Sequence, residues 1–146
     1  MENLRNVLGQ FKDKKVIVVG DVMLDWTITG TDKGPNLESL EARMMDVLDG
    51  YGDYRLGGAG NVARNVVSLG ASCYLLGQVG KDWPGEEINR LCDEGGIKKY
   101  FVDSGGMTIL KQRIFLDKGK YMIRINFGEQ NLGHLDHQKE QELETA

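Results

Sequence analysis

A glycine-rich turn directly before a helical segment constrains the fold of this chain more than any other feature. Residues 57–61 have the sequence Gly-Gly-Ala-Gly-Asn, apolar residues follow at helical spacing to Leu69, and Gly70 then ends the helix. Glycine has no Cβ, so the backbone can approach a ligand closely, and the N–H groups at the start of the helix point into the same space. The turn suits a polyol or a phosphate, although an ordinary tight turn is the simpler interpretation when the motif is taken alone.

Strands and helices alternate through the first hundred residues. The β-branched run Lys15–Gly20 is typical of a central parallel strand that is covered on both faces. Further strands are predicted at 26–31, 72–79 and 99–102, and helices at 4–11, at 61–69 and after Asp82, whose side chain can cap the last of them. Residues 32–53 fit neither pattern. The alternation predicts a parallel, three-layered α/β core.

Two β-rich runs interrupt this alternation. They cover residues 108–116 and 120–127 and flank an Asp-Lys-Gly sequence, which predicts an antiparallel hairpin. If Lys118 and Gly119 form a two-residue turn, Arg113 lies opposite Arg124, and Lys111 lies opposite Asn126.

The basic residues of this hairpin would share one face. Side chains alternate along a strand, so Lys111, Arg113 and Arg124 would point the same way. Like charges placed opposite each other destabilise a hairpin, and a bound phosphate would relieve that cost because the arginine fork can bind two of its oxygens. A solvated basic face fits the spacing equally well.

Asp25 follows the end of the first predicted strand, at the edge where doubly wound folds bind ligands. A carboxylate there can accept two hydrogen bonds from neighbouring sugar hydroxyls, and a capping or surface role is the alternative. The sequence from Gly20 to Asp25 lacks the G-x-G-x-x-G pattern, so a dinucleotide-binding Rossmann domain fits poorly.

Composition argues against several classes of partner. The chain has a net charge of -4 and a pI near 5.2, whereas proteins that bind nucleic acids or anionic membranes present a basic surface. No apolar run approaches the length of a membrane-spanning helix. Cys73 and Cys92 have no metal-ligand spacing, so we expect buried thiols in a reducing compartment, the cytoplasm. His134 and His137 lack a third ligand, so no metal site is predicted.

The spacing of the glycine turn to Gly70 and Gly80 resembles the first signature of the ribokinase-like (pfkB) family of sugar kinases. The segments 20–25 and 80–85 agree with it, so the resemblance covers essentially the whole chain. It implies a ribokinase-like three-layer αβα fold with a small antiparallel β lid at about 26–56 and 108–127. The substrate-binding residues that it implies are Asp25, Gly57, Gly58, Ala59 and Asn61.

Within that family the chain is similar to the heptose-7-phosphate kinase branch. Residues 108–113 match its Thr-x-x-Lys-x-Arg pattern, 123–126 resemble Ile-Arg-Leu-Asp, and 39–42 resemble Ser-Pro-Glu-Ala. The substrate of that branch already bears a phosphate, which implies phosphate binding by Lys111, Arg113 and Arg124. Arg43 and Met45 replace prolines of the branch, and Asn126 replaces its Asp, so the exact sugar stays open.

The resemblance implies the sugar-binding half of an ATP-dependent carbohydrate kinase. The family's second signature, Gly-Ala-Gly-Asp, holds the catalytic Asp, whereas residues 58–61 end in Asn61 and belong to the first signature by their spacing. We therefore expect residues 1–146 to form a single partial domain. The nucleotide site for ATP with Mg²⁺ and the catalytic Asp are expected in a C-terminal half that this sequence does not contain, so the isolated chain is expected to be catalytically incomplete.

The alternative is a non-catalytic sugar-binding or dimerisation module from a split or truncated kinase. The expected partners are a sugar or sugar phosphate, together with a second copy bound through the β lid or a complementary C-terminal half. Neither nucleic acid nor a membrane is expected as a partner.

Overall fold

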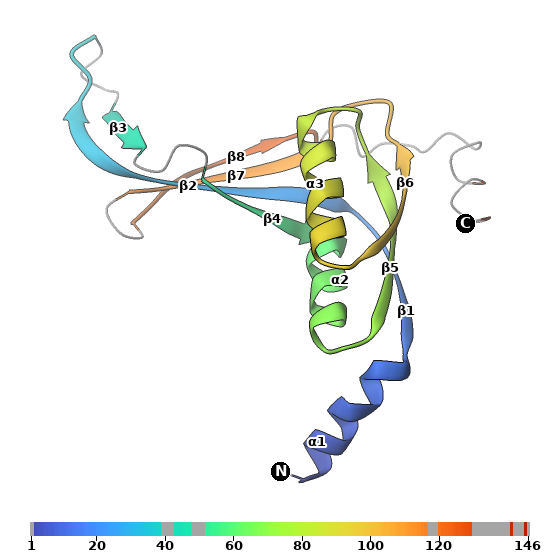
Figure 1. Cartoon of the computed structure of the whole chain (residues 1–146). Coiled ribbons are helices and arrows are strands. Elements are labelled where there is room, and N and C mark those ends of the chain that lie inside the picture. The colour runs from blue at the N-terminus through green and yellow to red at the C-terminus, as the bar shows by residue number, and fades with distance from the viewer. Residues whose placement is uncertain are drawn as a thin grey trace.

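The computed structural model describes residues 2–38, 43–47, 52–116, 120–129, 141 and 145. These residues form two β-sheets, with helices packed where the sheets meet (Figure 1). The first, which we call the core sheet, is parallel and has the strand order β1-β5-β6. Its elements are β1 (Lys15–Val19), β5 (Ser72–Val79) and β6 (Lys98–Asp103), with helices α2 (Ala59–Ser68) and α3 (Trp83–Glu94). The N-terminal segment holds α1 (Glu2–Gly9) and the short 3₁₀ helix η1 (Gln10–Asp13).

The second sheet, which we call the lid sheet, has five strands and extends beyond the helices (Figure 1). Its strands are β2 (Val22–Pro35), β3 (Arg43–Val47), β4 (Asp53–Gly58), β7 (Ile109–Leu116) and β8 (Lys120–Phe127). The sequence predicted antiparallel lid strands, but β2 and β7 run parallel, so the sheet is mixed. β2 is the central strand because it pairs with β7 on one side and with β4 and then β3 on the other.

A single hydrophobic core joins the two sheets. Leu75 of β5 and Ile88 of α3 are fully buried in the same cluster as Leu24 of β2. Leu56 and Leu110 extend the cluster into the lid strands β4 and β7. Burying a side chain of this size stabilises a fold by about 1.5–3 kcal/mol, so the base of the lid is held by the same burial as the core sheet.

The strand predicted to be covered on both faces is covered on only one. β1 lies at the edge of the core sheet and pairs only with β5 among the described strands. Val18 packs against the core cluster, whereas Ile17 and Val19 are 66% and 67% exposed. α2 and α3 lie on the same side of the core sheet (Figure 1). The β-branched run correctly predicted a parallel strand, but cover on its second face depends on other elements, which the described residues do not supply.

The hairpin prediction was correct in its register and wrong in its turn. Arg113 pairs with Arg124, as predicted, and Lys111 with Asn126. However, Leu116 pairs with Lys120, so a two-residue turn does not fit. The register shifts after Ile114, and this irregularity restores the predicted pairing further along the strands. Residues 117–119 lie outside the described part of the chain.

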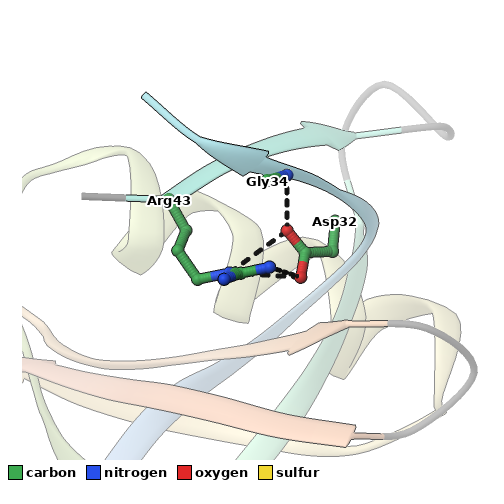
Figure 2. A network of polar contacts seen from close by, with 3 residues as sticks. All are labelled: Asp32, Gly34 and Arg43. Carbon is green, nitrogen blue, oxygen red and sulfur yellow. Dashed lines mark hydrogen bonds and ion pairs between the residues drawn. The ribbon is translucent and has the colours of Figure 1, made fainter. Parts of the chain in front are cut away.

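The segment that the sequence left unassigned contains a strand pairing. β2 continues to Pro35, and β3 returns antiparallel to it, with a register shift between Asp32 and Gly34. Figure 2 shows how Asp32 supports this bend: its Oδ1 accepts a hydrogen bond of 2.8 Å from the Gly34 N–H, and the Arg43 guanidinium binds both carboxylate oxygens. Hydrogen bonding from Arg43 holds the pKa of Asp32 below its ordinary value of 3.8.

Two local predictions are confirmed. Asp82 caps α3, with its Oδ1 accepting a 3.1 Å hydrogen bond from the Gly85 N–H. Cys73 and Cys92 are buried free thiols, and burial raises the pKa of Cys92 to about 11.

No helix in the described ranges is long and apolar enough to cross a membrane. His134 and His137 lie outside those ranges, as do residues 39–42.

Candidate functional site

One face of the lid sheet gathers most of the charged residues that the sequence singled out. Residues paired across neighbouring strands point to the same side of a sheet, so the register determines which side chains lie together. The neighbours Leu24 and Leu110 point to the opposite side, into the core. We call the following set the polar face: Arg55, Asp25, Lys111 and Asn126 in one row across β4, β2, β7 and β8, and Asp53, Thr27, Arg113 and Arg124 in the next row.

Asp25 and Arg113 form an ion pair within this face. Arg113 Nη1 lies 2.6 Å from Asp25 Oδ1, and the two side chains are 30% and 26% exposed. A charge-assisted hydrogen bond of this kind orients both groups. The residue implied to bind sugar hydroxyls and one of those implied to bind phosphate are therefore direct partners. The Asp25 carboxylate also supplies part of the negative charge that the Arg113–Arg124 pairing requires.

Lys111 has a different partner, which the sequence did not reveal. Its Nζ lies 3.2 Å from Oε1 of Glu129, just beyond the end of β8. The other oxygen of Glu129 accepts a 3.0 Å hydrogen bond from Asn126 Nδ2. The signal for this contact in the sequence was the predicted hairpin register, because it places Asn126 opposite Lys111 and Glu129 follows only three residues later. Arg124 is exposed on the same face and makes no ion pair with any residue that the structure describes.

The glycine turn lies directly against Asp25. A Cβ on Gly57 would lie 2.7 Å from Asp25 Oδ2, so a side chain there would displace the carboxylate. Gly58 has a φ of +55°, and a Cβ on it would lie 2.3 Å from the Asp21 carbonyl oxygen. The turn therefore requires glycine at both positions, and it brings the start of α2 close to Asp25.

The residues after the turn occupy the first turn of α2. The Ala59 N–H donates a 2.9 Å hydrogen bond to the Asp21 carbonyl oxygen, which ties the start of the helix to the start of β2. Asn61 is exposed on the same helical turn. The structure thus brings Gly57 into contact range of Asp25 and Gly58 against Asp21, and it leaves the Asn61 side chain exposed in the first turn of α2.

A buried hydrogen-bond network positions the start of β7, which bears Lys111 and Arg113. Thr108 is 2% exposed, and its hydroxyl donates to Asp82 Oδ1 over 2.6 Å and accepts from the Gly80 N–H over 2.8 Å. The Thr108 N–H donates to Asp82 Oδ2 over 2.9 Å. The sequence identified Asp82 only as a helix cap. Its second role, as a link between α3 and the lid sheet, depends on a residue 26 positions away.

Each face of the lid sheet borders a cavity, and the two cavities differ in the polarity of their lining residues. A cavity of about 340 Å³ is lined by Thr27, Thr29, Gly52 and Asp53, beside the polar face. On the other side, a cavity of about 360 Å³ is lined largely by apolar residues, among them Trp26, Trp83 and Phe127. Trp83, predicted as a packing residue, contacts Trp26 edge-to-face at a centroid distance of 5.8 Å. Of these two cavities, the one with the polar lining lies on the side of Asp25.

Comparison with known proteins agrees with this architecture. Residues 13–146 match the profile of a family that is described as "pfkB family carbohydrate kinase". A D-beta-D-heptose 7-phosphate kinase from Bordetella bronchiseptica is 41% identical over 114 residues, which cover 77% of this chain and 35% of that protein. A bifunctional protein HldE from Hydrogenovibrio crunogenus is 37% identical over 120 residues, covering 82% of this chain and 24% of the relative. The chain thus spans about a third or less of the length of these relatives.

A solved structure shares the fold. Phosphofructokinase-2 from Escherichia coli, in complex with fructose-6-phosphate, superposes with a TM-score of 0.64 at 18% identity, over 90% of this chain and 40% of that one. The ribokinase-like α/β fold expected from the sequence is confirmed by this likeness. The match to the family profile extends over nearly all of the sequence, from the end of the N-terminal helices onward. The chain belongs to the pfkB family of carbohydrate kinases.

Proposed function

We propose that this chain is the sugar-binding part of an ATP-dependent carbohydrate kinase, and that it binds a sugar phosphate such as heptose 7-phosphate. One observation supports this most directly: the polar face places the Asp25 carboxylate in the same row as Lys111 and one row from Arg113. A carboxylate accepts hydrogen bonds from adjacent sugar hydroxyls, whereas lysine and arginine bind phosphate oxygens. One sheet face thus offers both kinds of contact to one ligand.

The charge balance of the site favours an anionic ligand. The polar face together with Glu129 contains four cations and three carboxylates, although the whole chain has a net charge of -4. Arg124 accounts for the excess cation. A neutral sugar would need only Asp25 and hydroxyl-bearing neighbours such as Thr27. A phosphate on the sugar gives Arg124 and Lys111 a partner of opposite charge.

The names of similar proteins support the same substrate class. The Bordetella relative is named for heptose 7-phosphate, and the Escherichia coli structure contains fructose-6-phosphate. Both ligands are sugar phosphates. The glycine turn, with its close approach to Asp25, is the part of the chain that we assign to the sugar ring.

ATP and Mg²⁺ follow from the family rather than from this site. The described residues include no group of three or more His, Cys, Asp or Glu side chains that could hold a metal ion. This chain covers 24% and 35% of two similar proteins, and we propose that the nucleotide, the metal and the catalytic Asp belong to the part of their length that it does not span. The proposed work of the residues in this chain is to bind and orient the sugar phosphate, in the cytoplasm.

A second candidate function is a non-catalytic sugar-binding or dimerisation module. Strand β8 favours it: within the described part of the chain it is the last strand of the lid sheet, and Met122 and Ile123 are 42% and 47% exposed there. An unpaired strand edge with apolar side chains is a common site of association. We propose a homodimer formed through the lid sheet, or a complex with a complementary C-terminal half, as the assembly.

Calorimetric titration of the 146-residue chain with D-glycero-D-manno-heptose 7-phosphate tests the proposed function. We expect the wild type to bind, and Asp25→Asn to lower the affinity at least about tenfold, because Asn lacks the charged oxygen that accepts hydrogen bonds from sugar hydroxyls. Asp93→Asn is the matched control, since Asp93 is a 72% exposed carboxylate on α3 that pairs with Lys99 and does not belong to the polar face. It should change the affinity less than about twofold.

The outcome separates the two candidates. Binding that is lost in Asp25→Asn and kept in Asp93→Asn supports the sugar-binding assignment. Tight dimerisation by light scattering, without any heptose 7-phosphate binding, contradicts it and supports the dimerisation module. Equal losses in both variants would show that Asp25 has no special role.

A further inference from the structure

We propose that Glu129 lowers the affinity of the polar face for phosphate by competing with it for Lys111. The inference rests on the proposed function, and it adds a specificity-determining residue to that site. Glu129 Oε1 lies 3.2 Å from Lys111 Nζ, so this ammonium is already occupied by a carboxylate in the absence of ligand. A phosphate that binds Lys111 must displace Glu129.

The backbone next to Glu129 makes this contact a defined feature of the fold. Gly128 has a φ of +75°, and a Cβ on it would lie 2.8 Å from the Thr108 carbonyl oxygen. Only glycine tolerates both the dihedral angle and the close approach. The turn at Gly128 brings Glu129 back over the sheet, where Asn126 Nδ2 donates to its second oxygen over 3.0 Å. Glu129 is therefore held on both carboxylate oxygens.

The two cations of β7 are paired in different ways. Arg113 is held by Asp25, which we assign to sugar hydroxyls, over 2.6 Å within the sheet. Lys111 is held by Glu129, which comes from outside the sheet and is 39% exposed. A partly exposed pair of this kind is weak, so a dianionic phosphate can replace the carboxylate. Glu129 and the phosphate would otherwise be two anions in contact, which is unfavourable.

This competition predicts an effect that depends on ligand charge. A neutral sugar bound through Asp25 does not require Lys111, so Glu129 leaves its affinity unchanged. A sugar phosphate must release Lys111 from Glu129, so its affinity is reduced. A purely positioning role, in which Glu129 orients Lys111 for the phosphate, predicts the opposite sign.

The test compares Glu129→Gln with wild type by calorimetry, using heptose 7-phosphate, unphosphorylated heptose and inorganic phosphate as ligands. Gln keeps the size of the side chain and an oxygen that can accept the hydrogen bond from Asn126. We expect about two- to fivefold tighter binding of both phosphate ligands, and no change for unphosphorylated heptose. In the double variant Lys111→Met with Glu129→Gln, the gain should vanish relative to Lys111→Met alone.

Glu94→Gln is the matched control, because Glu94 is an exposed ion-pair partner of Arg90 on α3, and its substitution changes the net charge equally. A similar gain in Glu94→Gln would overturn the proposal, since it would reflect overall charge. Unchanged or weaker phosphate binding in Glu129→Gln would also overturn it and favour a positioning role. An absence of phosphate binding in both wild type and Glu129→Gln would overturn it as well.

The proposed function fails on a separate result. A wild-type chain that binds inorganic phosphate but no heptose 7-phosphate through Asp25 would remove the sugar-binding assignment. In that case a tighter binding of inorganic phosphate by Glu129→Gln would still support competition at Lys111.

Discussion

Among the residues that the structure describes, the core sheet and the lid sheet each present an exposed face, and the two faces have opposite chemistry. On the core sheet, Ile17, Val19 and Tyr100 point away from α2 and α3 and are 66%, 67% and 46% exposed. On the lid sheet, the uncovered polar face includes the Asp25–Arg113 pair. Apolar surface is stabilised by contact with other apolar surface, whereas a face of paired charges suits a small polar ligand. The comparison separates a surface for packing from a surface for ligand binding.

The spacing of apolar residues along the strands explains why the two exposed faces differ in chemistry. β1 is apolar at each of the positions 16–19, so it presents apolar side chains on both faces of its sheet. In β2, apolar and polar residues alternate from Leu24 to Thr29, so one face enters the core and the other is polar. The register of β7 with β2 then places Lys111 and Arg113 beside Asp25 and Thr27. The charged residues of the polar face therefore follow from the alternation in β2 together with its register with β7.

The largest expected effect tests whether the two sheets form one cooperative unit. Leu24→Ala removes a fully buried side chain from the core that the sheets share, so we expect a loss of about 2–5 kcal/mol in the free energy of unfolding. Urea unfolding followed by circular dichroism measures it. Leu37→Ala, at a side chain that is 94% exposed, should stay within about 0.5 kcal/mol of wild type. Two separate transitions in the wild type would show instead that the lid melts independently.

A smaller effect is expected from changes on the apolar face of the core sheet. The double variant Ile17→Glu with Val19→Glu should change the free energy of unfolding by less than about 1 kcal/mol, because both side chains are mostly exposed. It should lower the fluorescence of bound anilinonaphthalene sulfonate, which reports exposed apolar surface. Heptose 7-phosphate binding should be unaffected. Weaker heptose binding in this variant would show that the two faces are not independent.

The smallest expected effect is a pH dependence of the lid sheet that arises from the ionisation of Asp32. The lowered pKa of Asp32, caused first by its hydrogen bond from Arg43, means that its ionised form stabilises the lid sheet. This stabilisation is fully present above the ordinary value of 3.8 and is lost as the pH falls through the lowered pKa. An NMR titration of the Asp32 carboxyl carbon should give a midpoint below 3.8, and Arg43→Met should raise it. An unchanged midpoint in Arg43→Met would contradict this cause.

Much of the local structure follows from the sequence. The Asp82 cap and the glycine turn obey rules that involve residues only a few positions apart. The pairing of Arg113 with Arg124 is nearly local as well, because a hairpin brings together strands that are adjacent in the chain. Even there the turn was predicted wrongly, since a register irregularity leaves no trace in the alternation of side chains.

The contacts within the candidate site could not be predicted from such local rules. Arg113 and Asp25 are 88 positions apart and meet because β2 and β7 pair in parallel, a choice that the local pattern of either strand does not specify. Glu129 reaches Lys111 because Gly128 turns the chain against Thr108. Contacts of this kind depend on how distant elements pack, so they cannot be obtained from spacing alone.

By itself, the sequence indicated the family, the strands and helices other than β3 and β4, and the residue types available for a sugar phosphate. These follow from periodicity, glycine spacing and charge, which are properties of short segments. Tertiary structure alone decided which charges are partners, which face of β1 is covered, and that Lys111 is already bound by a carboxylate. The physical reason is that ion pairs and burial depend on three-dimensional distance, which the parallel pairing of β2 and β7 sets for this site.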